Sequence, residues 1–270
     1  MSLVISYYGV EKCGKTTFGF TAIKAFDEGI MVHFDFDLGR ERAIWRFPEK
    51  WASRIQTVRF PEVPTWTLGS GAITESWRRF EEIYAQALSD PQVRVVFIDT
   101  VSQMHSLNAD EYLENYVSKS ALSRGKPARH QLQQIEYRTP NTRTRAKIMA
   151  ARHAEKLLIM SHYEGDVYHE QFVQRPDGSL TKESVKTGAK THKGFGDIAY
   201  AVDHHLQLFL RNINVDAQGV EQSPPNLISV VRILTPNPPG AFGIEIPEPT
   251  YMRLTKMIDG IKAASMMEEE

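Results

Sequence analysis

Short, mostly apolar runs alternate along the chain with longer stretches of mixed polarity. The apolar runs lie near residues 3–8, 30–36, 55–60, 94–99 and 156–162. Such runs are typical of strands that are buried on both faces, as in a parallel sheet. Helices are predicted between the runs, near residues 15–27, 74–88, 104–118 and 142–155. Strands that alternate with helices in this way predict an α/β fold, with a mainly parallel central sheet and helices on both faces.

The second half of the chain departs from this alternation. Residues 164–194 have a Pro-Asp-Gly centre between β-rich flanks, which predicts a hairpin or a long mobile loop. A short helix, two more strands and a proline-rich turn region follow, and together they predict a C-terminal β extension. We find no internal repeat and no clear linker. The prediction is therefore a single domain over residues 1–270, with a long insertion at 102–155 and a helical acidic tail at 251–270.

The first apolar run leads into a glycine-rich segment, GVEKCGKTTF, at residues 9–18. It fits the phosphate-loop pattern G-x-x-x-x-G-K-[ST]. Backbone N–H groups of such a loop point at phosphate oxygens, and the helix that begins at Lys15 adds its positive N-terminal end. We expect Lys15 to reach the outer phosphates and Thr16 to ligate Mg²⁺. The predicted nucleotide-binding residues are Gly9, Val10, Glu11, Lys12, Cys13, Gly14, Lys15, Thr16 and Thr17.

Two further predicted strands end in acidic residues. RVVFIDT reads as a central parallel strand that ends in Asp99, and an aspartate there lies near the magnesium of a phosphate loop. In GIMVHFDFDLGR, Asp35 and Asp37 point to the same face because strand side chains alternate. We expect Asp37, the later of the two, to polarise the attacking water. The alternative is that these carboxylates only cap helices or turns.

The run KLLIMSHY ends in Ser161, His162 and Tyr163. A polar side chain at this strand end is placed to sense the terminal phosphate and to pass the signal to the loop that follows. We therefore predict that His162 is a phosphate sensor. The alternative is a structural histidine, which is the more common role of a lone histidine.

Composition and charge narrow the classes of function. The chain has 270 residues, of which 41% are hydrophobic and 24% charged, and a formal net charge of −1. These values are typical of a globular protein and argue against an indiscriminate polyanion binder. No apolar stretch approaches the roughly 20 residues that span a bilayer, and no signal peptide is apparent. The single cysteine excludes an intrachain disulfide, so we expect a cytoplasmic protein without a membrane partner.

In their order along the chain, these motifs resemble the RecA-like ATPase core, in particular compact phage-type members linked to recombination and single-strand annealing. GVEKCGKTTF resembles the family's phosphate loop, HFDFDLG its catalytic carboxylate strand and VVFIDTVS its Asp-bearing strand. LLIMSHY resembles the strand that ends in the phosphate sensor, where the family usually has Gln and this chain has Ser161 and His162. The resemblance implies ATP hydrolysis with Asp37 as the catalytic carboxylate. It also implies that Arg232, in the closing strands, reaches the nucleotide of a neighbouring subunit in a homo-oligomer.

Two segments that flank the strand ending in His162 carry basic residues. Residues 119–156 hold ten basic and two acidic residues, a net charge of +8. Residues 164–194 hold one arginine and four lysines, with aromatic residues in or beside them. Such a mixture suits single-stranded DNA, because the charge follows the backbone and the rings stack on bases. The alternative is a solvated helical face and an ordinary hairpin.

Three functions fit these observations. The first is a Mg²⁺-dependent ATPase that binds single-stranded DNA in recombination or annealing. The second is a P-loop kinase for a small molecule, for which we find no short arginine-rich lid. The third is a nucleotide-switched factor for phage assembly or DNA packaging. We favour the first, with ATP as the nucleotide, because the guanine-reading pattern Asn-Lys-x-Asp is not present.

Overall fold

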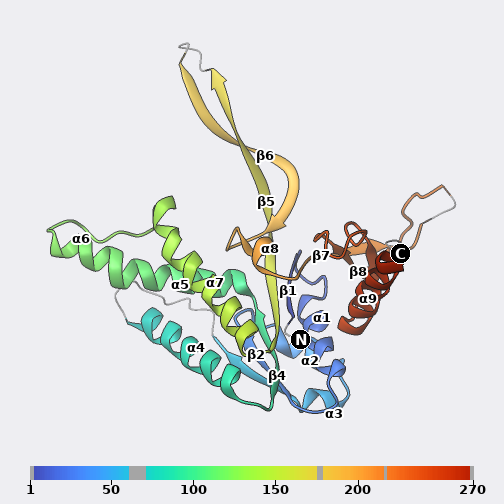
Figure 1. Ribbon diagram of the computed structural model, residues 1–270. Helices are drawn as coiled ribbons and strands as arrows, with labels where there is room; N and C mark the ends of the chain where they lie inside the picture. The colour runs from blue at the N-terminus through green and yellow to red at the C-terminus, as the bar shows by residue number, and fades with distance from the viewer. Residues whose placement is uncertain (1–2, 61–70, 175–178, 216–217, 268–270) are drawn as a thin grey trace.

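The computed structural model describes residues 3–60, 71–174, 179–215 and 218–267. Within these residues nine strands form one sheet in the order β3-β2-β4-β5-β1-β7-β8-β9, and β6 pairs with β5 outside that path (Figure 1). The strands are β1 (Val4–Gly9), β2 (Ile30–Asp35), β3 (Ile55–Arg59), β4 (Val93–Asp99), β5 (Leu157–Gln174), β6 (Leu180–His192), β7 (His204–Asn212), β8 (Leu227–Ile233) and β9 (Glu245–Pro247).

The neighbouring strands from β3 through β2, β4, β5 and β1 to β7 run parallel to one another. Strands β8 and β9 add an antiparallel edge beside β7. The register aligns the carboxyl ends of the parallel strands. Asp35 at the end of β2 lies opposite Asp99 at the end of β4, and Gly9 at the end of β1 lies opposite Tyr163 in β5. The polar residues that follow these strands therefore gather along one edge of the sheet.

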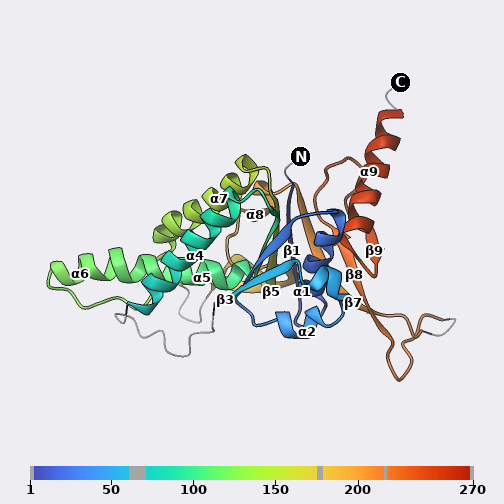
Figure 2. The same ribbon diagram turned by 90° about the horizontal axis from the view of Figure 1, so that it is seen from below.

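Helices cover both faces of the sheet (Figure 2). One face carries α4, α5 and α7, and the other carries α1, α2 and α9. The α-helices are α1 (Lys15–Phe20), α2 (Arg40–Ile44), α3 (Glu49–Ala52), α4 (Ala72–Ser89), α5 (Val101–Tyr112), α6 (Lys119–Ser123), α7 (Arg138–His153), α8 (Ile198–Ala201) and α9 (Tyr251–Met267). Three other helical turns are η1 (Thr21–Ala25), the π-helical η2 (Leu113–Ser118) and η3 (Gln134–Tyr137).

The core has two layers because strand side chains alternate between the faces. Phe34 and Val96 pack with Phe80 of α4 on one face, whereas Phe97 packs with Phe20 of α1 on the other. All of these side chains are fully buried. This two-sided burial explains why β2 and β4 read as continuous apolar runs rather than as alternating patterns.

The α/β fold class predicted from the sequence is confirmed, and the five predicted parallel strands lie within about two residues of their predicted positions, except that β5 extends to Gln174. The helix predicted over 15–27 is shorter than expected, because α1 ends at Phe20 and a 3₁₀ turn continues to Ala25. The short helices α2 and α3 and strand β9 were not predicted. The Pro-Asp-Gly centre at 176–178 and the acidic end at 268–270 lie outside the described residues.

The hairpin predicted over 164–194 is an arm made by the outer part of β5 and by β6, and it extends away from the sheet (Figure 1). Between Tyr168 and Gln174, six of the seven residues are exposed, so the outer arm packs mainly against its own partner strand. No helix in the described parts of the chain is long and apolar enough to cross a membrane.

Candidate nucleotide-binding site

The phosphate loop between β1 and α1 has the backbone shape that its glycines predict. Gly14 has a φ of 99°, in the left-handed region that favours glycine. A Cβ on Gly9 would lie 2.2 Å from the carbonyl oxygen of Leu208 in β7, so only glycine fits there. Cys13 is fully buried beneath the loop, and this burial raises the pKa of its thiol. The side chain of Cys13 therefore packs in the core, and only its backbone is placed to meet a nucleotide.

Two hydroxyl groups from the sheet hold the loop in place. The Tyr7 hydroxyl donates to the Lys15 carbonyl oxygen at 2.8 Å, and the Ser229 hydroxyl of β8 donates to the Cys13 carbonyl oxygen at 2.8 Å. The Lys15 ammonium donates to the carbonyl oxygens of Gly9 and Val10 at 2.9 and 2.7 Å. The lysine is thus held inside the curve of the loop, where a phosphate loop places its cation.

Oxygen ligands for a divalent cation meet below the loop. The Thr16 hydroxyl donates to Asp99 Oδ2 at 2.6 Å, and the Ser161 hydroxyl donates to the other oxygen of Asp99. Burial alone raises the pKa of Asp99, but the His33 ring 3.8 Å away and hydrogen bonds from Ser161 and Thr16 outweigh it and hold this pKa below its ordinary value. A carboxylate kept ionised beside a threonine hydroxyl is an oxygen donor set that fits Mg²⁺. Thr16 and Asp99 lie together as the sequence predicted.

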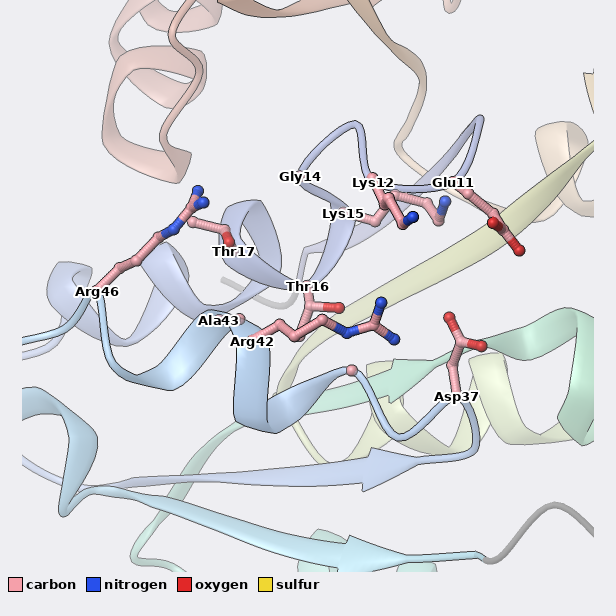
Figure 3. Close-up of a pocket in the computed structure, with 11 residues that line it drawn as sticks. Glu11, Lys12, Gly14, Lys15, Thr16, Thr17, Asp37, Arg42, Ala43 and Arg46 are labelled. Carbon is pink, nitrogen blue, oxygen red and sulfur yellow. The ribbon is translucent and has the colours of Figure 1, made fainter.

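The two carboxylates that follow β2 have different surroundings. Asp35 is fully buried, and its oxygens accept the backbone N–H groups of Asp37, Gly39 and Arg40 at 3.1–3.4 Å. It is therefore a capping residue for this turn. Asp37 instead lines the cavity below the phosphate loop (Figure 3). Burial raises the pKa of Asp37, and a hydrogen bond from Tyr163 partly opposes that rise.

The cavity between the phosphate loop and α2 has a volume of about 250 Å³ and holds two arginines that the sequence analysis missed. The Arg42 guanidinium extends toward the space between Thr16 and Asp37, and Arg46 lies near Thr17 (Figure 3). Both arginines lie in GRERAIWR, which follows the turn after β2. The positive charge of this segment, close behind the carboxylate strand, is the sequence feature that could have predicted them. Gly39 also lines the cavity, and a Cβ there would lie 2.8 Å from the Thr16 hydroxyl.

A neighbouring hollow of about 340 Å³ continues from the phosphate loop toward β7 and β8. It shares Gly14, Thr17 and Arg46 with the first cavity. Its far wall contains the apolar side chains of Leu208 and Ile228. A hollow with an apolar wall and polar groups around it, next to a phosphate loop, is suited to the base of a nucleotide.

The structure places the three residues at the end of the predicted run 156–162 on different faces of the sheet. Side chains alternate along β5, so Ser161 and Tyr163 face the nucleotide site and His162 faces away. The His162 ring is fully buried and packs 5.4 Å from the ring of His192, and burial holds its pKa well below the ordinary value. Within the described part of the chain, His162 contacts Lys193 and His192 and makes no hydrogen bond to Lys15, so its sensor role stays a prediction. The described residues contain no cluster of three or more metal-ligating side chains.

Arg232 lies in β8 and does not line the cavity below the phosphate loop of its own chain. Its guanidinium forms an ion pair with Glu245 of β9 at 2.6 Å and lies 5.2 Å over the Phe209 ring. The side chain is 42% exposed. Arg232 is therefore on the surface, as a residue that acts on a neighbouring subunit must be, and this role stays a prediction.

The basic segment at 119–156 has fewer unpaired cations in the structure than its count of basic residues indicates. Five of its cations form ion pairs, four of them with acidic residues from elsewhere in the chain: Arg129, Arg143, Arg145, Lys147 and Arg152. Lys156 is buried and donates to backbone carbonyls. Lys119 donates to the side-chain oxygen of Asn115 at 2.6 Å. Of the remaining cations, Arg124, Lys126 and Arg138 take part in no ion pair within the described residues. These three are the cations of the segment that are placed to meet a polyanion.

The positive charges of the hairpin at 164–194 are also paired with acidic side chains. The lysines of β6 pair with acids of β5: Lys182 with Glu170, and both Lys186 and Lys190 with Asp166. Residues 164–194 hold five basic and five acidic residues, so their net charge is zero. The exposed rings of the arm, at Tyr168 and Phe172, remain its features suited to stacking.

Comparison with solved structures finds distant likenesses. The chain is similar to the RadB recombinase, with 14% identity and a TM-score of 0.48 over 91% of this chain and 86% of that one. It is similar to a prototypical ATPase from the type III secretion system of pathogenic bacteria, with 12% identity and a TM-score of 0.42 over 77% and 52%. It is also similar to EscN from the enteropathogenic E. coli system, solved with its stalk EscO, with 12% identity and a TM-score of 0.43 over 77% and 42%. No protein family and no curated protein matches the chain.

The chain has a P-loop α/β fold, with the phosphate loop and the acidic strand ends along one edge of a mainly parallel sheet. The phosphate loop follows β1, and β5 lies between β1 and the Asp99-bearing strand β4. The carboxylate turn after β2 lies beside β4. The chain spans about half of the length of the secretion ATPases named above, and 12% identity transfers no residue's role to it.

Proposed function

We propose that this protein binds and hydrolyses ATP in the cavity between its phosphate loop and α2. The observation that supports this proposal most directly is the contact between Thr16 and Asp99, which lies beside Lys15 and opposite Asp37. Mg²⁺ held there by Thr16 and Asp99, directly or through water, would offset charge on the phosphate oxygens. The hollow lined by Leu208 and Ile228 would take the base.

The residues around the proposed terminal phosphate have separate roles in ATP hydrolysis. Lys15 binds the outer phosphates, and Asp37 orients the attacking water and accepts its proton. Arg42 extends into the same cavity and supplies positive charge from within the subunit. Asp37 suits a base because its pKa is raised by burial, which brings it closer to neutral pH.

Two substitutions test the ATPase assignment. Lys15→Ala should abolish ATP hydrolysis and weaken nucleotide binding, whereas Asp37→Asn should keep the binding of a non-hydrolysable ATP analogue and lose turnover. Lys256→Ala, an exposed lysine on α9, is the matched control and should behave as wild type. Wild-type turnover in Lys15→Ala, with an unchanged thermal melt, would rule out this site as the hydrolytic centre.

We also propose that the partner is single-stranded DNA, bound by the face that carries Arg124, Lys126 and Arg138 and by the exposed rings of the β5–β6 arm. The proposal is supported by the position of both segments, which flank β5 next to the nucleotide site. Reversing the charge of all three cations to Glu should flatten the slope of log affinity against log salt by about 2, since each contact contributes about 0.7.

The DNA experiment measures the binding of a fluorescent oligonucleotide at several salt concentrations, and ATP hydrolysis with and without that strand. A protein with Lys50, Lys256 and Lys262 changed to Glu has the same net charge and is the control. Equal loss of affinity in both triple variants would show only a general charge effect. Arg143, Arg145 and Lys147 are poor choices for this test, because their ion pairs support the fold.

One observation favours a second candidate, phosphoryl transfer to a small acceptor. Arg42 and Arg46 lie in the cavity after β2, where the sequence analysis had found no arginine lid. A kinase would turn over ATP only when its acceptor is present. ATP hydrolysis by the purified protein in buffer alone therefore separates the two candidates.

A further inference from the structure

A second cavity, of about 500 Å³, lies beside the nucleotide site and is used by none of the functions argued so far. Its walls come from α5, from η3 and the first turn of α7, and from the base of the β5–β6 arm. These elements adjoin one another below the arm (Figure 1). The cavity thus lies between the two segments that we propose to bind single-stranded DNA.

The lining of this cavity combines an aromatic wall with hydrogen-bonding groups of both kinds. The Tyr137 ring is stacked on the His105 ring, with centroids 6.3 Å apart and planes 29° apart. Gln103 and Asn141 bring amide groups, which both donate and accept. Asp110 adds a carboxyl group, and among the described residues it has no ion pair.

The charge at the cavity is small and local. Lys193 lies at the base of the arm and lines the cavity, and it forms no ion pair with any described residue. Burial lowers the pKa of His105 to about 4, so this ring is neutral at physiological pH. One cation and one carboxyl group beside an otherwise neutral pocket suit one phosphate group and an uncharged ring system better than a polyphosphate.

We propose that this cavity binds one unstacked nucleobase, with its phosphate on Lys193. Tyr137 provides the stacking surface that a base seeks when it leaves a strand. Gln103, Asn141 and Asp110 provide donors and acceptors for the base edge. A volume of about 500 Å³ is in the range of cavities that bury small ligands. When the base belongs to a DNA strand, the inference rests on the proposed function.

Tyr163 links this cavity to the nucleotide site. It lines the second cavity, yet its hydroxyl donates to Asp37 and its ring lies 5.9 Å from the Lys15 ammonium. Its backbone N–H donates to the Ser102 hydroxyl at 3.0 Å, and that hydroxyl donates to the Lys193 carbonyl oxygen at 2.7 Å. A base that moves Lys193 or Tyr163 would therefore change the position of Asp37.

The test compares two fluorescent strands of equal length, one of thymidine and one of abasic sugars, which have the same phosphates. We expect the wild-type protein to bind the thymidine strand about tenfold more tightly, within the range for stacking on one aromatic ring. In a background with Tyr168→Ala and Phe172→Ala, which removes the exposed rings of the arm, Tyr137→Ala should lose this preference and keep its affinity for the abasic strand. Tyr200→Ala is the control, because this ring is 91% exposed on α8 and lies outside the cavity.

Each of the other outcomes also tests the proposed base pocket. Equal affinity of the wild-type protein for both strands overturns the base pocket and leaves DNA binding intact. If neither strand binds, the DNA part of the proposed function fails, and calorimetry with thymidine monophosphate decides about the pocket. That titration contains a saturating non-hydrolysable ATP analogue, so that the phosphate loop is occupied. Binding that Tyr137→Ala removes would assign the pocket to a free nucleotide, and no binding would overturn it.

Discussion

At the scale of single residues, Tyr163 affects how readily Asp37 ionises. It follows Ser161 on the same face of β5, and its hydroxyl hydrogen bond to Asp37 lowers the pKa of a carboxyl group that burial raises. The burial of Tyr163 and this bond also raise the pKa of the phenol itself, so the hydroxyl stays a donor. The ionisation of the proposed catalytic base thus depends on its neighbour in β5.

This dependence predicts a shift in the pH profile of ATP hydrolysis. The profile should fall on the acid side as Asp37 becomes protonated, at a pH above the ordinary range of an aspartate. Tyr163→Phe removes the hydrogen bond that favours the ionised form, so the acid limb should move to higher pH. Tyr8→Phe, which loses a bond to the Lys190 carbonyl instead, should leave the limb in place. A limb that is the same in all three proteins would contradict Asp37 as the base.

Gly39 gives a second prediction at this scale. Its φ of −78° is open to any residue, but an alanine Cβ would lie 2.8 Å from the Thr16 hydroxyl and 3.6 Å from an Asp99 oxygen. Gly39→Ala should therefore displace the proposed cation ligands and weaken Mg²⁺-dependent hydrolysis by about 10–100-fold. The measurement is a Mg²⁺ titration of turnover. Gly196→Ala, where a Cβ meets nothing within 4 Å, should leave the titration unchanged.

At the scale of elements, the β5–β6 arm is expected to be separable from the rest of the fold. A two-stranded hairpin contributes little stability in water, and the outer arm is exposed along β5. Removing residues 170–184 and joining His169 to Val185, which pair across the arm, through an Asn-Gly turn keeps the register. The thermal melt followed by circular dichroism should change by only a few degrees, and ATP hydrolysis without DNA should be unchanged. A large loss of either would show that the outer arm packs on the body.

The same elements show which parts of the fold the sequence could predict. A strand buried on both faces requires mostly apolar residues along its length, so β2 and β4 could be predicted from the apolar runs in the sequence. The phosphate loop was evident because its glycines are needed for backbone geometry. The roles of Ser161, His162 and Tyr163 were not evident, since which of them faces Asp99 depends on the register of β5 against β1 and β4.

Charge could be counted in the sequence, but its pairing in space could not. Arg143 and Lys147 looked like part of a free basic surface, whereas they form ion pairs with Glu111 and Glu81 of other helices. These partners are more than 30 residues away along the chain. Arg42 was missed for a related reason, because only the fold places the segment after β2 beneath the phosphate loop.

At the scale of the whole molecule, the open question is whether one subunit contains all of the catalytic charge. Arg42 points into the cavity of its own chain, and Arg232 is paired with Glu245 on the surface. An arginine acting within the subunit makes turnover independent of assembly, even when the protein forms homo-oligomers. An arginine acting on a neighbour makes turnover per subunit rise with protein concentration.

We expect the cation within the subunit to dominate. Arg42→Ala should lower the turnover number by about 10³-fold, the lower end of what an arginine finger contributes, and should keep most of the affinity for an ATP analogue. Arg232→Ala, which loses a surface ion pair and a contact with the Phe209 ring, should change turnover and stability little. The measurement is ATP turnover per subunit over a range of protein concentrations for the three proteins. A turnover that rises with concentration and is lost in Arg232→Ala, but kept in Arg42→Ala, would assign the charge to the neighbouring subunit instead.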